Sequence, residues 1–224
     1  VRTLRRAGVN AHHILVGSIS PSVPHERMIL RTNTQEAVHI TGFVSAAVFN
    51  AYVDVADVCI NLRHPTAGET SASLLRLLAA GKPTFITASG SFLEIPRDAA
   101  VHVPLDAYEV DFLAAALFLC HQHPAFARQV GANARAYVQA QHTLERSAAA
   151  YMQVLTTLHG WEPPRTTRPV LWDVYPAQSA PLPVLQPARM TSRSRGPVPH
   201  ITQPAMAGAG PRLEALARQL FTKK

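Results

Sequence analysis

The sequence has few of the residues that build disulfide frameworks and metal sites. Only two of its 224 residues are cysteines, Cys59 and Cys120, and both fall within apolar stretches. This usage predicts buried thiols in a reducing compartment, the cytoplasm, rather than disulfides. The paired histidines His12–His13 and His121–His123 lack the third and fourth ligands of a tetrahedral metal site. We therefore expect surface histidines and no metal.

Long apolar runs and nucleotide-cofactor motifs are also missing. A transmembrane helix needs about 18 or more consecutive apolar residues, and no such run is present. The sequence shows neither a signal peptide nor a Gly-x-Gly-x-x-Gly or P-loop motif, so dinucleotide and ATP sites lack support. The chain opens on valine, and its first residues read as the middle of a helix. We expect a fragment of a longer protein.

Positive charge is concentrated at one end of the chain. The net charge is +7, yet residues 1–160 hold 12 Lys and Arg against 11 Asp and Glu. Beyond residue 160 the counts are 9 and 3. A nucleic-acid groove needs basic residues clustered on a folded surface, so no specific nucleic-acid partner is expected. The basic tail allows peripheral contact with an anionic membrane.

Composition divides the chain into three parts. Residues 1–160 alternate apolar strand-like and amphipathic helix-like segments, which predicts one α/β domain with a doubly wound parallel sheet. Residues 161–211 hold 11 of the 18 prolines and are predicted to be a disordered linker. Residues 212–224 are predicted to be a short helix or disordered.

The most informative stretch lies at residues 57–96. Residues 58–62 form an apolar strand-like run, 64–69 a loop, and 83–87 a second strand. Residues 70–80 carry four leucines at helical spacing, and Gly81 supplies the left-handed residue that ends a helix. This order predicts a right-handed βαβ unit in a parallel sheet. Ligands in such sheets bind beyond the carboxyl ends of the strands, where the loops at 64–69 and 89–94 should lie.

The loop before the predicted helix could bind an anion. The free N–H groups and the positive dipole end of a helix N-terminus attract phosphate. Gly68 permits close approach, Thr70 and Ser71 add hydroxyl donors, and the Glu69 carboxylate can accept hydrogen bonds from ligand hydroxyls. Ser and Thr are also ordinary helix caps, so the residues alone leave both interpretations open.

Several motifs in fixed order resemble the C-terminal, donor-binding domain of GT-B glycosyltransferases of group 1 (family 4), over about residues 1–159. They are Ala56-Asp57-Val58, Leu62-Arg63, Pro65, Gly68-Glu69-Thr70-Ser71, Gly81-Lys82-Pro83, Gly90-Ser91-Phe92, Glu94 and Pro96. The resemblance implies a Rossmann-like domain that takes part in transferring a sugar from a nucleotide diphosphate sugar to an acceptor, without a metal. A glycan, lipid or small-molecule acceptor would be bound by a first domain that this chain lacks.

The resemblance also implies site residues. Glu69 would be catalytic, and the donor would be bound by Arg63, Gly68, Thr70, Ser71, Arg76, Gly90 and Glu94. The family places two glutamates eight positions apart. Aligned on Gly81, these positions hold Gly68 and Arg76, whereas Glu69 stands one position later. Arg76 could contact a phosphate, pair with an acidic neighbour or remain solvated. The alternative function is a non-catalytic, truncated donor-domain module that binds nucleotide or a partner protein.

Overall fold

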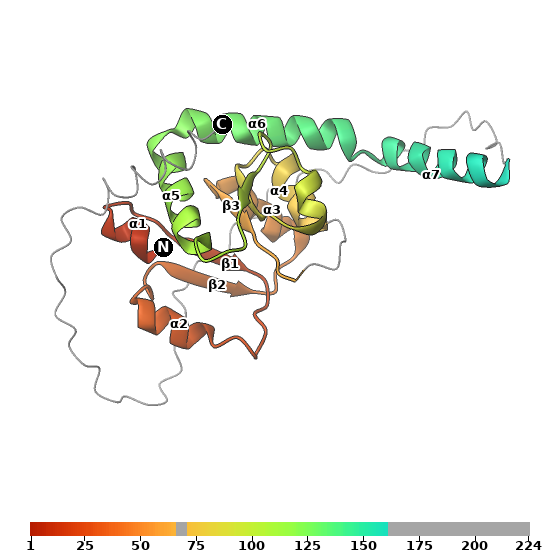
Figure 1. Ribbon diagram of the computed structural model, residues 1–224. Coiled ribbons are helices and arrows are strands. Elements are labelled where there is room, and N and C mark those ends of the chain that lie inside the picture. The colour runs from red at the N-terminus through yellow and green to blue at the C-terminus, as the bar shows by residue number, and fades with distance from the viewer. Residues whose placement is uncertain (66–70, 161–224) are drawn as a thin grey trace. The chain divides into compact units, whose positions relative to one another are not determined.

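The computed structural model describes residues 1–65 and 71–160 (Figure 1). Contacts divide the described residues into two compact units, 1–52 with 104–124 and 53–103 with 125–160. The tail predictions for residues 161–211 and 212–224 lie outside the described residues, as do the predicted loop positions 66–70.

The first unit contains a pair of parallel strands and a helical core. Its elements are α1 (Arg2–Arg6), β1 (His13–Val16), α2 (His25–Thr32), β2 (Val38–Gly42), most of α3 (Ala46–Val55) and α5 (Glu109–Gln122). Strands β1 and β2 pair in parallel with His13 opposite Val38. Leu4 of α1 and Phe118 of α5 are buried together, so these two helices depend on each other although they are far apart in sequence.

The second unit contains a three-stranded parallel sheet in the order β3-β4-β5. Its elements are β3 (Cys59–Asn61), α4 (Ala72–Ala79), β4 (Thr84–Thr87), the 3₁₀ helix η1 (Gly90–Glu94), β5 (Val101–Val103), α6 (Pro124–Gln141) and α7 (Leu144–His159). The segment β3–α4–β4 is the predicted βαβ unit, with Ile60 opposite Phe85. The α/β fold with parallel strands expected from the sequence is confirmed.

The central strand β4 is covered on both faces. All four of its residues are buried, as is usual for a strand in the middle of a parallel sheet. Ile86 packs in a cluster with Leu74 and Leu78 of α4 and Ala134 of α6. Because successive strand side chains point to opposite faces, Phe85 lies on the other face, and it is also 0% exposed.

The turn after α4 brings two backbone segments into direct contact. Gly81 has φ +72°, and its N–H donates to the Leu78 carbonyl at 2.9 Å, as predicted for a glycine that ends the helix. Arg135 of α6 donates to the carbonyls of Ala79 (3.1 Å) and Ala80 (2.8 Å). A Cβ at Gly131 of α6 would lie 2.1 Å from the Gly81 carbonyl oxygen. The absence of a side chain at Gly131 therefore allows α6 to approach this turn.

The local structure around η1 differs from the sequence expectation. The segment 89–94, expected as a loop, contains the 3₁₀ helix η1, with Gly90 at φ +56°. Strand β5 begins at Val101, because the N–H groups of Ala99 and Ala100 turn back to the Pro96 carbonyl.

Both cysteines are buried and free, as predicted. Burial raises the pKa of the Cys59 and Cys120 thiols to about 11, so both stay protonated and unreactive at neutral pH. None of the helices in the described part of the chain is long and apolar enough to cross a bilayer.

Candidate functional site at the N-terminus of α4

A buried serine begins helix α4. Ser71 is 3% exposed, and its Oγ accepts a hydrogen bond from the Leu74 N–H at 3.3 Å. Its extended backbone (φ −78°, ψ 110°) is typical of a helix N-cap. The cap explains why the sequence starts a helix here, after a loop rich in residues that favour turns.

Ser73 connects this cap to the end of strand β3. Its Oγ accepts from Asn61 Nδ2 at 3.1 Å and from Arg63 Nη2 at 3.3 Å, and lies 3.1 Å from Ser71 Oγ. A hydroxyl has two acceptor positions and one donor, so with both acceptor positions filled the Ser73 hydroxyl must donate to Ser71. Ser71 then accepts twice, and within residues 1–65 and 71–160 its own O–H remains as an uncommitted donor.

Another hydrogen bond joins the carboxyl ends of strands β3 and β4. The Arg63 N–H donates to Thr87 Oγ1 at 2.8 Å, and Thr87, the last residue of β4, is 2% exposed. This bond holds the start of the loop after β3 against the end of the neighbouring strand. Asn61 Oδ1 is buried and accepts no hydrogen bond from the described residues, so it is available as an acceptor at this edge.

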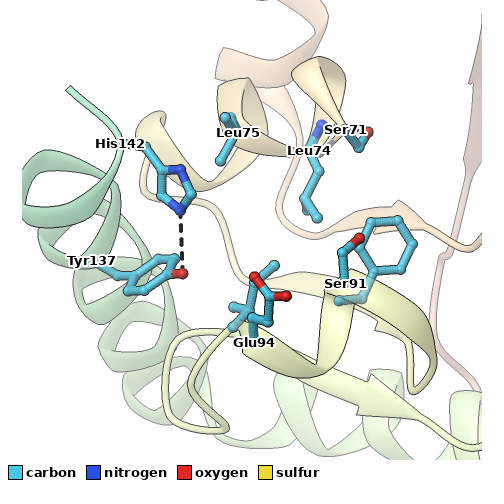
Figure 2. Close-up of a pocket in the computed structure, with 9 residues that line it drawn as sticks. Ser71, Leu74, Leu75, Ser91, Glu94, Tyr137 and His142 are labelled. Atoms are coloured by element: carbon cyan, nitrogen blue, oxygen red, sulfur yellow. Dashed lines mark hydrogen bonds between the residues drawn. The ribbon is translucent and has the colours of Figure 1, made fainter. Parts of the chain in front are cut away.

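A shallow depression adjoins the cap (Figure 2). It is lined by Ser71, Leu74, Leu75, Ser91, Phe92, Glu94, Ile95, Tyr137 and His142. Figure 2 shows Glu94 between Tyr137 and Ser91, with the α4 side chains across from them. The enclosed volume is only about 20 Å³, which holds a water molecule but not a sugar ring. A larger ligand would therefore lie over the depression.

Tyr137 of α6 and His142, just after that helix, contribute a tyrosine–histidine pair to this depression. The Tyr137 hydroxyl and His142 Nε2 lie 3.2 Å apart, with the rings edge to face at 5.2 Å. Burial raises the pKa of Tyr137, and the nearby negative charge of Glu94 raises it further. The phenol therefore stays protonated at neutral pH, beside a carboxylate and an imidazole that can accept or donate.

The predicted site residues fall into three groups. Arg63 and Ser71 belong to the hydrogen-bonded network, and Glu94 lines the depression, four residues after Gly90 in the same 3₁₀ helix. Gly68, Glu69 and Thr70 lie outside the described residues. Arg76 is exposed in the last turn of α4 and is not among the residues that line the depression.

Four residues of this region were not predicted from the sequence. Asn61 and Thr87 each end a strand, and a polar residue at the last position of an apolar run is the signal that could have identified them. Tyr137 and His142 lie on and just after an 18-residue helix far along the chain, and no local pattern connects them to α4. In the parts described, no three His, Cys, Asp or Glu side chains are grouped so that they could hold a metal ion.

We expect Ser71→Ala to lower the free energy of unfolding by about 1–2 kcal/mol, the usual cost of losing an N-cap side chain. The substitution also leaves the Ser73 hydroxyl without its acceptor. Urea unfolding followed by circular dichroism measures the loss. Thr143→Ala is the matched control, because Thr143 caps α7 in the same way but no residue of α7 is buried. An equal or smaller loss for Ser71→Ala would contradict the structural role of the cap.

Comparison with known proteins gives the fold but no close relative. No family model and no curated protein matches the sequence. Sucrose-phosphate synthase from Thermosynechococcus elongatus is similar in structure, with 26% identity over 71% of this chain and a TM-score of 0.55. HepE from Anabaena, solved in complex with UDP, is 18% identical over 66% of this chain, also with a TM-score of 0.55.

Both comparisons cover only part of the larger proteins. This chain spans 42% of the synthase chain and 41% of the HepE chain, so it corresponds to less than half of either. The parallel strands, the intervening helices and these two similarities together support a GT-B glycosyltransferase fold for the matched part of this chain.

Proposed function

We propose that this chain binds a nucleotide diphosphate sugar and forms the donor-binding part of a glycosyltransferase of the group 1 (family 4) type. The observation that carries the proposal is the network at the N-terminus of α4. Its hydrogen bonds leave the Ser71 hydroxyl as a donor and fix the Arg63 guanidinium beside it, at the carboxyl ends of β3 and β4. The structural similarity to a protein solved with UDP supports the same ligand class.

The chemistry of this end of α4 suits a diphosphate. A helix N-terminus carries the equivalent of about half a positive charge and stabilises a nearby anion by about 0.3–1 kcal/mol. A guanidinium adds a full charge and several N–H donors. In sugar transfer the nucleoside diphosphate leaves with increasing negative charge, and preformed donors stabilise that charge in the transition state.

The remaining predicted residues complete the proposal. Glu69 would accept hydrogen bonds from the sugar hydroxyls as the catalytic group, with Gly68 and Thr70 beside the phosphates. Gly90 and Glu94 would border the sugar. The reaction would need no metal, and the acceptor would be bound by a domain outside this chain.

One observation favours a second function. The resemblance places a ribose-binding glutamate at position 76, and this chain has Arg76, which cannot accept hydrogen bonds. Arg76 is exposed and has no side-chain partner in the described residues. A non-catalytic module that binds nucleotide or a partner protein would tolerate this exchange, whereas a transferase would need another ribose contact.

Titration of the full chain with UDP, GDP and ADP by calorimetry tests the proposal. We expect saturable binding of one nucleotide, and Arg63→Gln should weaken it about tenfold or more, because hydrogen bonds to charged groups contribute about 1.5–3 kcal/mol. Arg146→Gln, in exposed α7, is the matched control and should leave the dissociation constant unchanged.

Two results of this titration would contradict the proposal. Absence of saturable binding for all three nucleotides at millimolar concentration would exclude a nucleotide site in this chain. Binding that Arg63→Gln and Arg146→Gln weaken equally would place the nucleotide elsewhere. Binding without sugar transfer, in the presence of an acceptor-binding domain, would favour the non-catalytic module.

A further inference from the structure

The depression beside the N-terminus of α4 has an apolar floor and a polar rim. Its floor includes Leu74, Phe92 and Ile95, whose side chains are between 2% and 7% exposed. The polar lining residues are Ser71, Ser91, Glu94, Tyr137 and His142. A sugar ring has the matching form, because it carries C–H groups on its faces and hydroxyl groups around its edge. Small-molecule sites commonly combine an apolar lining with a few polar groups that fix orientation.

Tyr137 keeps a free hydrogen-bonding position at this rim. In the described part of the chain its hydroxyl has one hydrogen-bond partner, His142 Nε2, at 3.2 Å. If the phenol donates to the imidazole, the phenol oxygen can still accept from a ligand hydroxyl. If the imidazole donates, the phenol O–H can still donate to a ligand oxygen. Either direction therefore leaves Tyr137 able to bind a hydroxyl group.

Glu94 provides an acceptor next to Tyr137. Figure 2 shows the Tyr137 hydroxyl pointing toward Glu94. The Glu94 side chain is exposed, and an ionised carboxylate only accepts hydrogen bonds. A carboxylate and a phenol side by side can bind two neighbouring hydroxyls of one ring. The same carboxylate repels a phosphate, so the depression suits a sugar ring better than it suits the diphosphate.

Ser71 connects the depression to the proposed phosphate site. It lines the depression and also belongs to the hydrogen-bonded network that includes Arg63. A nucleotide diphosphate sugar carries a ring at each end of its diphosphate, the transferred sugar at one end and the ribose at the other. Either ring would reach the depression while the diphosphate lies at the network. A nucleobase fits less well, because Phe92 is only 2% exposed and offers no aromatic face for stacking.

We propose that the depression is the subsite for a sugar ring attached to the bound diphosphate, with Tyr137 and Glu94 as its hydrogen-bonding contacts and His142 positioning Tyr137. This inference rests on the nucleotide binding proposed above. The transferred sugar and the ribose share the hydroxyl chemistry that the rim recognises. If the ring is the ribose, Tyr137 and Glu94 supply the contact that Arg76 cannot make.

Calorimetric titration of the full chain with UDP and UDP-glucose, GDP and GDP-mannose, and ADP and ADP-glucose tests this subsite. Tyr137→Phe removes only the hydroxyl and keeps the ring, which packs against the core cluster of Leu74, Ile86 and Ala134. We expect binding about two- to tenfold weaker, the effect of losing one hydrogen bond. Weaker binding of the sugar nucleotide alone assigns the depression to the transferred sugar. Equal weakening of both members of a pair assigns it to the ribose.

Two further substitutions complete the experiment. Tyr151→Phe is the matched control, because Tyr151 is 74% exposed on α7, and it should leave every dissociation constant unchanged. His142→Ala should weaken the same ligands as Tyr137→Phe. Added to Tyr137→Phe it should cause no further loss, because His142 acts through the Tyr137 hydroxyl. Additive losses would contradict this positioning role.

The titration separates failure of this subsite from failure of the proposed function. If the unchanged chain binds a nucleotide pair and Tyr137→Phe binds both members equally well, the subsite is wrong and the proposed function stands. A loss for Tyr151→Phe as large as that for Tyr137→Phe would also overturn the subsite. Absence of nucleotide binding by the unchanged chain would overturn both.

Discussion

Phe85→Ala is expected to lower the free energy of unfolding by about 3–5 kcal/mol, the usual cost of truncating a buried phenylalanine. Phe85 is 0% exposed and stands in the central strand, opposite Ile60 of β3 and Val101 of β5. The substitution removes apolar contacts and leaves a cavity in a sheet that is buried on both faces. Few domains have a free energy of unfolding large enough to remain fully folded after such a loss, so much of the chain should be unfolded at 37 °C.

Urea unfolding followed by circular dichroism measures the effect of Phe85→Ala. Phe43→Ala is the matched control, because Phe43 is 88% exposed and its truncation should change stability by less than about 0.5 kcal/mol. Phe85→Leu keeps most of the apolar volume and should recover most of the loss. Similar losses for Phe85→Ala and Phe43→Ala would contradict the placement of Phe85 in the core.

Gly131→Ala is the second substitution with a large expected effect on the free energy of unfolding. The sign of that effect tests the structure. In a helix interior alanine is more stable than glycine by about 1 kcal/mol, so helix propensity alone predicts stabilisation. The structure predicts the opposite, because the added Cβ would lie 2.1 Å from the Gly81 carbonyl oxygen. Neither group is the end of a flexible side chain, so α6 must move. We expect a net loss of about 1–3 kcal/mol, typical of overpacking.

The same unfolding measurement, with Ala136→Gly as control, tests the contact between α6 and the Gly81 turn. Ala136 is an exposed position of α6, and its replacement should cost about 1 kcal/mol through propensity alone. If Gly131→Ala stabilises the chain, α6 does not approach Gly81 as closely as the structure shows. Arg135→Gln, made alone, should also lower the free energy of unfolding, because the Arg135 guanidinium donates to the carbonyls of Ala79 and Ala80.

Helices and turns with a local signal could be predicted from the sequence. The leucine spacing within residues 70–80 predicted α4, which spans Ala72–Ala79 in the structure. Gly81 was predicted as the left-handed residue after α4, and its φ is +72°. Both predictions depend on residues within one or two helical turns, where backbone geometry and side-chain spacing are coupled directly.

Features that depend on distant residues could not be predicted. The serine-rich start of α4 indicated a cap, but the bond from Arg63 to Thr87 requires two strand ends to meet. The Tyr137–His142 pair reaches the same region from α6. His12 was predicted only to be a surface histidine next to His13, and its contact with His39 depends on the pairing of β1 with β2. In each case the pairing of strands or the packing of α6 decides the contact.

The first unit is built from two segments that are far apart in the sequence, and this has a consequence for protein synthesis. The first segment ends at residue 52 and the second begins at residue 104. Leu4 of α1 in the first segment packs against Phe118 of α5 in the second. At about 5–20 residues per second, Phe118 is added on the order of ten seconds after Leu4. During that interval Leu4 on the nascent chain lacks its native partner. A nascent chain that ends before residue 104 cannot complete this core, and we expect it to be a substrate for chaperones that bind exposed apolar segments.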